Sequence, residues 1–308
     1  MFTLPRSFMY VPGDRERLFP KAYSSGADAL VLDLEDSVAP ARKSLARSAV
    51  RDWLVQLDGT ASEQQGAAAG GSRHLGEPTK GDKPSDPQIW ARIDPANAED
   101  DLQALVLNRL VGIFLAKTTQ QNLDDVSAVL GRLESERGME PGGIGVIGLI
   151  ESAEALREAQ MIASHPRLIT FGIGEVDLLA DLRVERQPDT ESAIDSIRLQ
   201  IVIAAAVTGL LPPVAPTSTR FRDLSDFDVT SRHFSALGFR SRTAIHPSQI
   251  AVIHKVLTPS SEEVRSAREV VDLFEAADGG VAVDPTGRMI DLAVVRSANE
   301  IIQRSEYS

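Results

Sequence analysis

Eight short apolar runs recur along the chain with helical patterns between them. This alternation is typical of parallel strand–helix units, in which each helix returns the chain to the start of the next strand. After Glu151, for example, Ser152 can cap a helix and Pro166 follows its end. We therefore expect an α/β protein with a (β/α)8 TIM barrel. The runs are SFMYVPG, ALVLDLED, IWARID, GIFLAK, GVIGLIE, LITFGIGEVD, GLLPPVAP and RTAIHP, and they start at Ser7, Ala29, Ile89, Gly112, Gly145, Leu168, Gly209 and Arg242.

Two segments fall outside this pattern. Residues 57–88 are rich in Gly, Ala, Ser, Pro and charge, and they would bury too little surface to offset the entropy of ordering them. We expect them to be a flexible surface insertion in a barrel domain of residues 1–258. Residues 259–308 follow the last unit and predict a C-terminal helical extension, in which Ser260 and Glu263 form a capping box and Gly279 and Gly280 end a helix.

The net charge and the absence of cysteine exclude several types of partner and of catalytic chemistry. The net charge of −12 argues against nucleic acid or an anionic membrane as the main partner, because the long-range field repels both. The absence of cysteine excludes disulfides, thiolate catalysis and cysteine-bound metal centres. The start, MFTLPRSFMYVPG, lacks signal-peptide features, and the most apolar window, from Ile201, is broken by Gly209 and three prolines. We expect a cytoplasmic protein.

Polar residues collect where the predicted strands end. In a (β/α)8 barrel the active site lies at the carboxyl ends of the strands, so these residues would line one polar cup. Any one of them could instead be polar simply because the chain is leaving the core. The residues are Pro12 and Gly13 after the first run, Asp33, Glu35 and Asp36 after the second, Arg92 and Asp94 after the third, Lys117 after the fourth, Glu151 after the fifth, Gly174, Glu175 and Asp177 after the sixth, and His246 after the eighth.

Within this set, Glu151 and Asp177 follow neighbouring strands and are the candidate metal ligands. Two carboxylates with waters and ligand oxygens are the usual way in which proteins hold Mg²⁺. Lys117 leaves a second chemistry open, because a Schiff-base lysine can stand at the end of a barrel strand. The carboxylate pair makes metal-assisted chemistry the stronger of the two hypotheses.

Two further side chains each allow two interpretations. Arg92 could neutralise Asp33 or Glu35, or it could bind a substrate carboxylate or enolate through its planar fork. His246 could hydrogen-bond locally beside Pro247, or it could touch substrate.

The chain resembles the citrate lyase β-subunit-like proteins, within the Mg²⁺-dependent aldolases and lyases that include malyl-CoA and citramalyl-CoA lyases. The resemblance lies in a collinear series that covers nearly the whole chain apart from the insertion. The series is RSFMYVPGDRERLFPKAYSSGADALVLDLEDSVAPARK, then ARID, GIFLAK, GLIESAEAL, FGIGEVDLLADL and GFRSRTAIHPSQI.

This resemblance implies a barrel in homotrimers or larger assemblies, with Mg²⁺ (or Mn²⁺) on Glu151 and Asp177 and with CoA as part of the substrate. It gives Arg92 the role of substrate-binding arginine. The segment GRMIDLA looks like the C-terminal motif whose aspartate closes a neighbouring subunit's site, which places Asp291 in a catalytic role. The residues expected to line the substrate are Glu35, Asp36, Gly174 and Glu175, and those expected to receive the CoA phosphates, unless they are only a solvated helix face, are Arg15, Arg17 and Lys21.

The functional hypothesis is a Mg²⁺-dependent carbon–carbon lyase, or the reverse condensation, acting on a 3-hydroxyacyl thioester such as citramalyl-, malyl- or citryl-CoA. One alternative is an aldolase on free α-keto acids. Others are a thioesterase or malate-synthase-like activity on the same scaffold, and a non-catalytic subunit that binds an acyl carrier or a CoA ester. Comparison of acyl-CoA with free acids as substrates distinguishes the thioester lyase from the aldolase. Turnover without a partner protein argues against the non-catalytic subunit.

Overall fold

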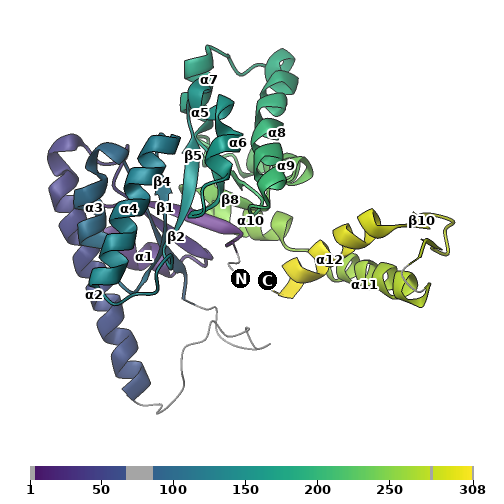
Figure 1. Cartoon of the computed structure of the whole chain (residues 1–308), viewed down its shortest axis with the longest axis horizontal. Helices are drawn as coiled ribbons and strands as arrows, with labels where there is room; N and C mark the ends of the chain where they lie inside the picture. Colours follow the sequence, from purple (N-terminus) through teal and green to yellow (C-terminus); the bar gives the residue numbers. More distant parts are fainter. Residues whose placement is uncertain (1–3, 67–85, 278–279, 307–308) are drawn as a thin grey trace. The chain divides into compact units, whose positions relative to one another are not determined.

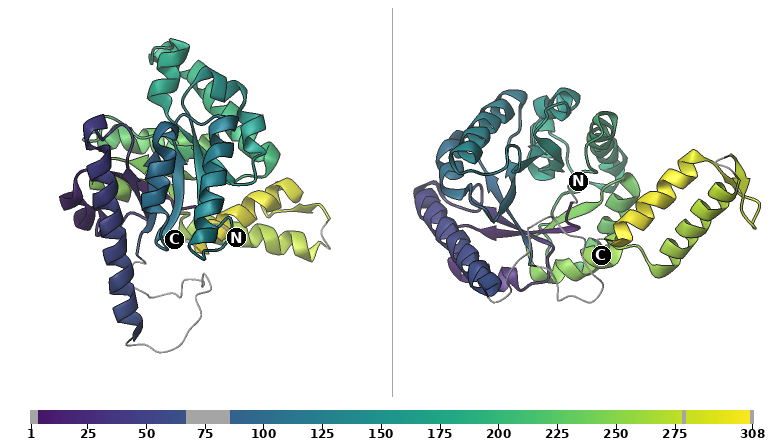
Figure 2. Two further views of the ribbon diagram at one scale, coloured as in Figure 1. Left: turned by 60° about the vertical axis from the view of Figure 1, so that its left-hand side comes forward. Right: turned by 60° about the horizontal axis from the view of Figure 1, so that its bottom comes forward.

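The computed structural model describes residues 4–66, 86–277 and 280–306. Within these ranges the chain forms two compact units, residues 4–66 with 86–253 and residues 254–277 with 280–306. The first unit holds a closed barrel of eight parallel strands in chain order, in which β8 pairs with β1. The right-hand view in Figure 2 shows helices surrounding these strands. The predicted (β/α)8 fold is confirmed.

The strands and helices of the barrel unit alternate as predicted (Figure 1). The strands are β1 (Ser7–Pro12), β2 (Ala29–Asp33), β3 (Gln88–Ile93), β4 (Leu110–Leu115), β5 (Gly145–Ile150), β6 (Leu168–Ile173), β7 (Val214–Ala215) and β8 (Ser241–Ala244). The helices are α1 (Phe19–Tyr23), α2 (Lys43–Gly66), α3 (Ala98–Leu105), α4 (Gln120–Glu136), α5 (Ala153–Arg157), α6 (Ala159–Ala163), α7 (Glu175–Leu182), α8 (Glu191–Thr208), α9 (Leu224–Leu237) and α10 (Ile250–Leu257), of which α10 spans the boundary between the units.

Large side chains fill the barrel. Phe8 makes edge-to-face contacts with Trp90 and Phe114, at centroid distances of 5.5 and 5.2 Å. Trp90 needs Gly112 opposite it, because a Cβ on that residue would come within 2.3 Å of the indole ring. The buried aliphatic side chains of neighbouring strands complete this cluster, so the barrel is a packed core and polar side chains are left to its rim.

The seventh strand is shorter than its apolar run predicts. Only Val214 and Ala215 form ladder pairs, although the run extends from Gly209 to Pro216. Pro212, Pro213 and Pro216 lack the backbone N–H that a ladder requires, so pairing is confined to the two residues between them.

The predicted insertion also begins later than expected. Helix α2 continues to Gly66, so the first ten residues of the 57–88 segment belong to a helix. The stretch TASEQQG contains Ala, Glu and Gln, which favour helix and outweigh the effect of Gly59. Residues 67–85 lie outside the described residues, and β3 starts at Gln88.

The second unit is a helical hairpin. Helices α11 (Ser261–Ala276) and α12 (Leu292–Glu306) pack side by side (Figure 1), and the short antiparallel strands β9 (Ala282–Val283) and β10 (Met289–Ile290) lie between them in the sequence. The predicted capping box is present, because Ser260 Oγ accepts from the N–H of Glu263 and the Glu263 carboxylate accepts from the N–H of Ser260. In the described ranges, no helix is both long enough and apolar enough to cross a bilayer.

Candidate active site at the carboxyl ends of the strands

The site is built on an ion pair between neighbouring strands. Asp33 ends β2 and stands in register with Arg92 of β3. Nε and Nη2 of Arg92 donate to the two carboxylate oxygens of Asp33 across 2.7 and 2.6 Å. Burial alone would raise the pKa of Asp33, but the hydrogen bonds and charge of Arg92 hold it below its usual value. Asp33 is therefore an ionised anchor, and Arg92 makes the neutralising contact that was one of its two predicted roles.

Glu35 joins this pair to the next strand. Its Oε1 atom accepts from Nζ of Lys117 across 3.0 Å, and its Oε2 atom lies 3.2 Å from Nη1 of Arg92. Oε2 also accepts from the backbone N–H of Asp36. Burial raises the pKa of Glu35, and the Asp36 carboxylate adds to this effect. The Asp36 side chain itself is mostly exposed, 3.8 Å from Arg92, so it stands at the edge of the cup.

Glu151, directly after β5, is buried between the backbone of Lys117 and that of Gly174. The N–H of Lys117 donates to its Oε2 across 2.6 Å. On the other side a Cβ at Gly174 would stand only 2.4 Å from its Cγ and Oε1. Gly174 was expected to line substrate, and because Glu151 occupies the space that a side chain on Gly174 would fill, only its backbone is left for that role.

The electrostatics of Glu151 connect it to Asp177. Burial raises the pKa of Glu151 to about 7, while the Lys117 amide and the charge of Arg92 oppose the rise. The negative charges of Glu35 and Asp177 raise the pKa further. Asp177 is exposed on α7, and this helix starts beside Glu151, because the N–H of Gly174 donates to the carbonyl of Ile150 across 3.1 Å.

Both carboxylate oxygens of Glu175 are engaged by arginines. Arg198 of α8 donates to them across 2.6 and 3.0 Å, and Arg186 adds a further contact. Glu175 was expected to line substrate. Its buried, doubly paired carboxylate instead favours a structural role in the first turn of α7.

Tyr10 is a site residue that the sequence analysis missed. Its ring lies under the guanidinium of Arg92, 5.1 Å from centroid to Cζ, and beside Phe114. Burial raises its pKa, as do the negative charges of Asp33 and Glu151, so the hydroxyl stays protonated. Among the described residues this hydroxyl has no hydrogen-bond partner. Strand alternation was the available signal, because Tyr10 shares the inward face of β1 with Phe8.

The predicted phosphate-binding cluster lies just after β1. Arg15 and Arg17 are exposed and, together with Glu16, line a cavity of about 370 Å³ that is open to the surface and formed by residues 14–18. Lys21 is exposed near the end of α1 and is not among the residues that line this cavity.

The last two predicted residues have local partners. The Nδ1 atom of His246 bonds Ser248, and its ring stacks on Phe221 at 5.4 Å, which matches the local role considered for it. Asp291 belongs to the helical hairpin, where its Oδ1 caps α12 by accepting from the N–H groups of Ala293 and Val294.

Comparisons with known proteins cover almost the whole chain. Residues 7–308 match the family of carbon–carbon bond lyases of the TIM-barrel fold. The citrate lyase subunit beta of Escherichia coli K12 is 31% identical over 98% of this chain and 94% of its own. The L-malyl-CoA/beta-methylmalyl-CoA lyase of Cereibacter sphaeroides is 30% identical with the same coverage. The CitE protein of Mycobacterium tuberculosis, solved with magnesium, acetoacetate and coenzyme A, covers 97% of both chains with a TM-score of 0.69 and 26% identity.

Proposed function

Because this chain belongs to the carbon–carbon bond lyases of the TIM-barrel fold, we propose that it is a Mg²⁺-dependent lyase acting on a 3-hydroxyacyl-CoA. Cleavage would give an acyl-CoA and a 2-oxo acid, and the reverse condensation uses the same site. The names of the related lyases support a malyl-, methylmalyl- or citryl-type acyl group, and the related structure with magnesium and coenzyme A supports the cofactor and the thioester.

The observation that carries this proposal is an excess of negative charge at the strand ends. Asp33, Glu35, Glu151 and Asp177 bring four carboxylates, whereas Arg92 and Lys117 bring two cations. Burial is the main cause of the raised pKa of Glu151, and the negative charges of Glu35 and Asp177 add to it.

A divalent cation held by Glu151 and Asp177 would supply the missing charge, and carboxylate oxygens are the ligands that Mg²⁺ prefers. When bound, Mg²⁺ supplies a Lewis acid and a template for the oxo-acid end of the substrate.

The side chains of the chain would share the remaining work. In cleavage the 3-hydroxyl would lose its proton to water as it becomes the carbonyl of the oxo acid. Arg92 would stabilise the negative charge that develops as the bond between the α- and β-carbons breaks and its electron pair stays on the thioester as an enolate. The Tyr10 hydroxyl, which has no partner among the described residues, would donate to a substrate oxygen beside Arg92. Asp291, brought by a second copy of the chain, would give the α-carbon its proton in cleavage and remove it in condensation.

The cavity after β1 would receive the CoA moiety. Arg15 and Arg17 line it, and guanidinium groups bind phosphate oxygens in a planar, bidentate manner. Their exposure leaves them open to a charged ligand, and Asp14 on the same loop is already paired with Arg42.

A substrate panel tests the proposal. Purified protein is offered malyl-CoA, citramalyl-CoA and citryl-CoA, each with Mg²⁺ and with a chelator, and both the oxo acid and the acyl-CoA product are quantified. We expect equal amounts of the two products from one thioester and none with the chelator. Release of free CoA thiol without an oxo acid would indicate a thioesterase instead, and turnover of free hydroxy acids alone would remove the thioester from the account.

A further inference from the structure

A buried arginine connects α8 to the first turn of α7. Arg198 is 2% exposed, and its guanidinium lies over the ring of Phe234, 4.6 Å from Cζ to centroid. It donates from Nε and Nη2 to the two oxygens of Glu175 across 2.6 and 3.0 Å. Both oxygens of Glu175 are thereby fixed relative to the long helix α8.

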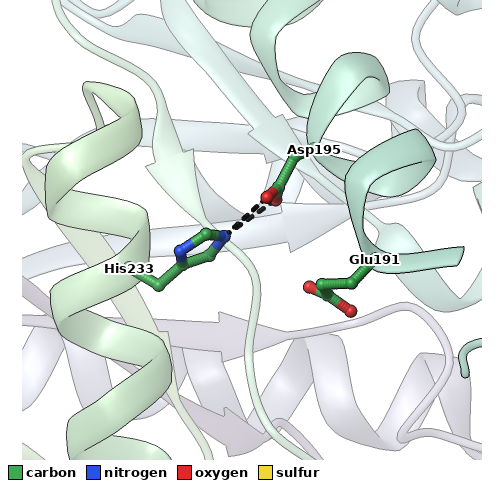
Figure 3. A group of neighbouring side chains, drawn as sticks. All are labelled: Glu191, Asp195 and His233. Atoms are coloured by element: carbon green, nitrogen blue, oxygen red, sulfur yellow. Dashed lines mark hydrogen bonds and ion pairs between the residues drawn. The ribbon is translucent and has the colours of Figure 1, made fainter. Parts of the chain in front are cut away.

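The other side of the same guanidinium is held by α8 itself. Nη1 of Arg198 donates to Glu191 and Asp195, at 2.7 Å in each case. Asp195 in turn faces His233 of α9, with both of its oxygens 2.9 Å from the imidazole Nε2 (Figure 3). In the described part of the chain, Glu191, Asp195 and His233 are grouped closely enough to ligate a metal. Arg198 donates to both of these carboxylates and Arg186 lies 3.6 Å from Glu191, so cationic side chains already occupy the group, which serves to orient Arg198.

Helix α7 depends on such an anchor. It has eight residues, too few to be stable alone, so tertiary contacts decide where it lies. Glu175, Leu178 and Leu179 are buried, whereas Asp177 is exposed one residue before the apolar pair. The Asp177 backbone is therefore fixed by an ion pair on one side and by apolar packing on the other.

We propose that the Arg198–Glu175 pair is a clamp that positions Asp177 toward Glu151 for a divalent cation. The proposal rests on the function proposed above, in which Asp177 is a metal ligand. Glu175 and Arg198 are positioning residues, since neither would touch the metal or the substrate. The clamp fixes the chain two residues before the ligand, and loss of a group that orients a metal ligand lowers metal affinity about 10- to 100-fold.

The test measures Mn²⁺ binding to the metal-free protein by electron paramagnetic resonance, in which free Mn²⁺ gives the signal. The variant is the double replacement Glu175→Leu with Arg198→Met, which removes the buried pair as a unit, while Asp195 keeps His233 and Glu191 keeps Arg186 as partners. Glu175→Gln is the milder second variant, since it keeps shape and weakens the pair.

The matched control is a second buried pair of the same chemistry. Arg167 donates to both oxygens of Glu134 across 2.8 and 3.1 Å, and Glu134 has no exposed surface. The double replacement Glu134→Leu with Arg167→Met loses the clamp that joins α4 to the start of β6, and with it the acceptor of the Gly142 and Ile144 N–H groups. Melting temperatures of all variants report any general loss of stability.

We expect the Glu175/Arg198 variant to raise the Kd for Mn²⁺ by about 10- to 100-fold, Glu175→Gln to raise it in the same direction, and the Glu134/Arg167 control to leave it unchanged. Equal affinities in the Glu175/Arg198 variant and wild type would overturn the clamp, and so would an equal loss in the control. Asp177→Asn separates the two proposals, because wild-type Mn²⁺ affinity in that variant would overturn the metal assignment itself.

Discussion

The backbone N–H of Lys117 donates to Oε2 of Glu151 across 2.6 Å, and it does so from a left-handed conformation with φ of +49°. A residue with a Cβ seldom adopts this conformation, and where it does the surrounding structure enforces it. Here Asn122 enforces it, because its Nδ2 donates to the carbonyl of Lys117 across 2.7 Å. The strained turn thus holds one oxygen of the proposed metal ligand, while Gly174 leaves room for the rest of the side chain.

Gly174→Ala should disrupt the metal site. The added Cβ would stand 2.4 Å from Cγ and Oε1 of Glu151, so the carboxylate must move away from its hydrogen bond with Lys117. We predict a large loss of Mn²⁺ affinity together with a lower melting temperature. Gly131→Ala is the control, because its Cβ would meet only Arg167 at 3.7 Å, and it should stabilise α4 by about 0.5–1 kcal/mol. Unchanged Mn²⁺ affinity in Gly174→Ala would show that the site tolerates a displaced Glu151.

Tyr10→Phe should impair turnover without affecting the fold. The ring and its contact with Arg92 remain, and only the hydroxyl is lost. If that hydroxyl donates to a charged substrate oxygen, kcat/KM should fall about 10- to 100-fold, as expected for one such hydrogen bond. Steady-state kinetics with the preferred thioester measures this, and the melting temperature checks the fold. A kcat/KM equal to that of wild type would place the hydroxyl outside the reaction.

Two replacements of Asp291 can separate its role as a helix cap from its proposed role in proton exchange. Its Oδ1 caps α12, and asparagine provides the same oxygen, so Asp291→Asn should keep the melting temperature and the Mn²⁺ affinity while turnover is lost. Asp291→Ala should lose both turnover and about 1 kcal/mol of helix stability. Full turnover in Asp291→Asn would mean that the residue is a helix cap and has no part in proton exchange.

Asp101, which is not a residue of the candidate site, should make the free energy of unfolding depend on pH. Burial raises its pKa to about 6, although Arg47 donates to it across 2.7 Å. The folded state therefore binds this proton more tightly than the unfolded state does, so the stabilising contribution is present at low pH and is lost as the pH rises through 6.

Asp101→Asn removes this titration. Relative to wild type, the free energy of unfolding of the variant should rise by about 1 kcal/mol between pH 5 and pH 7.5. Urea titrations of both proteins at the two pH values measure the difference. Parallel pH dependence in the two proteins would contradict the raised pKa.

The barrel was predictable because its strands are buried on both faces and appear in the sequence as short apolar runs. The polar residues after those runs were predictable for a related reason, since strand ends such as Asp33 and Arg92 leave the core at a common rim. The length of the seventh strand was mispredicted because apolar character was weighed above the missing N–H groups of Pro212 and Pro213.

The side-chain contacts that hold the site in place, such as the Glu175–Arg198 pair, were harder to predict from the sequence. Glu175 and Arg198 lie on different helices, and their pairing depends on how α8 packs against the barrel. A signal existed nevertheless, because Arg198 occupies the buried stripe of α8 between Ile194 and Ile201. A charge at an apolar position of a helix indicates a buried partner, but only the fold identifies that partner as Glu175.

The most direct test of the central claim compares Glu151→Gln with wild type in thioester cleavage at increasing Mg²⁺ concentration. Glutamine keeps the shape of the side chain and an oxygen for the Lys117 N–H, but it removes the charge that a divalent cation requires. The account predicts a folded variant, with a melting temperature close to that of wild type, whose oxo-acid production stays at background at every Mg²⁺ concentration. Mg²⁺-dependent cleavage at the wild-type rate in Glu151→Gln would contradict it.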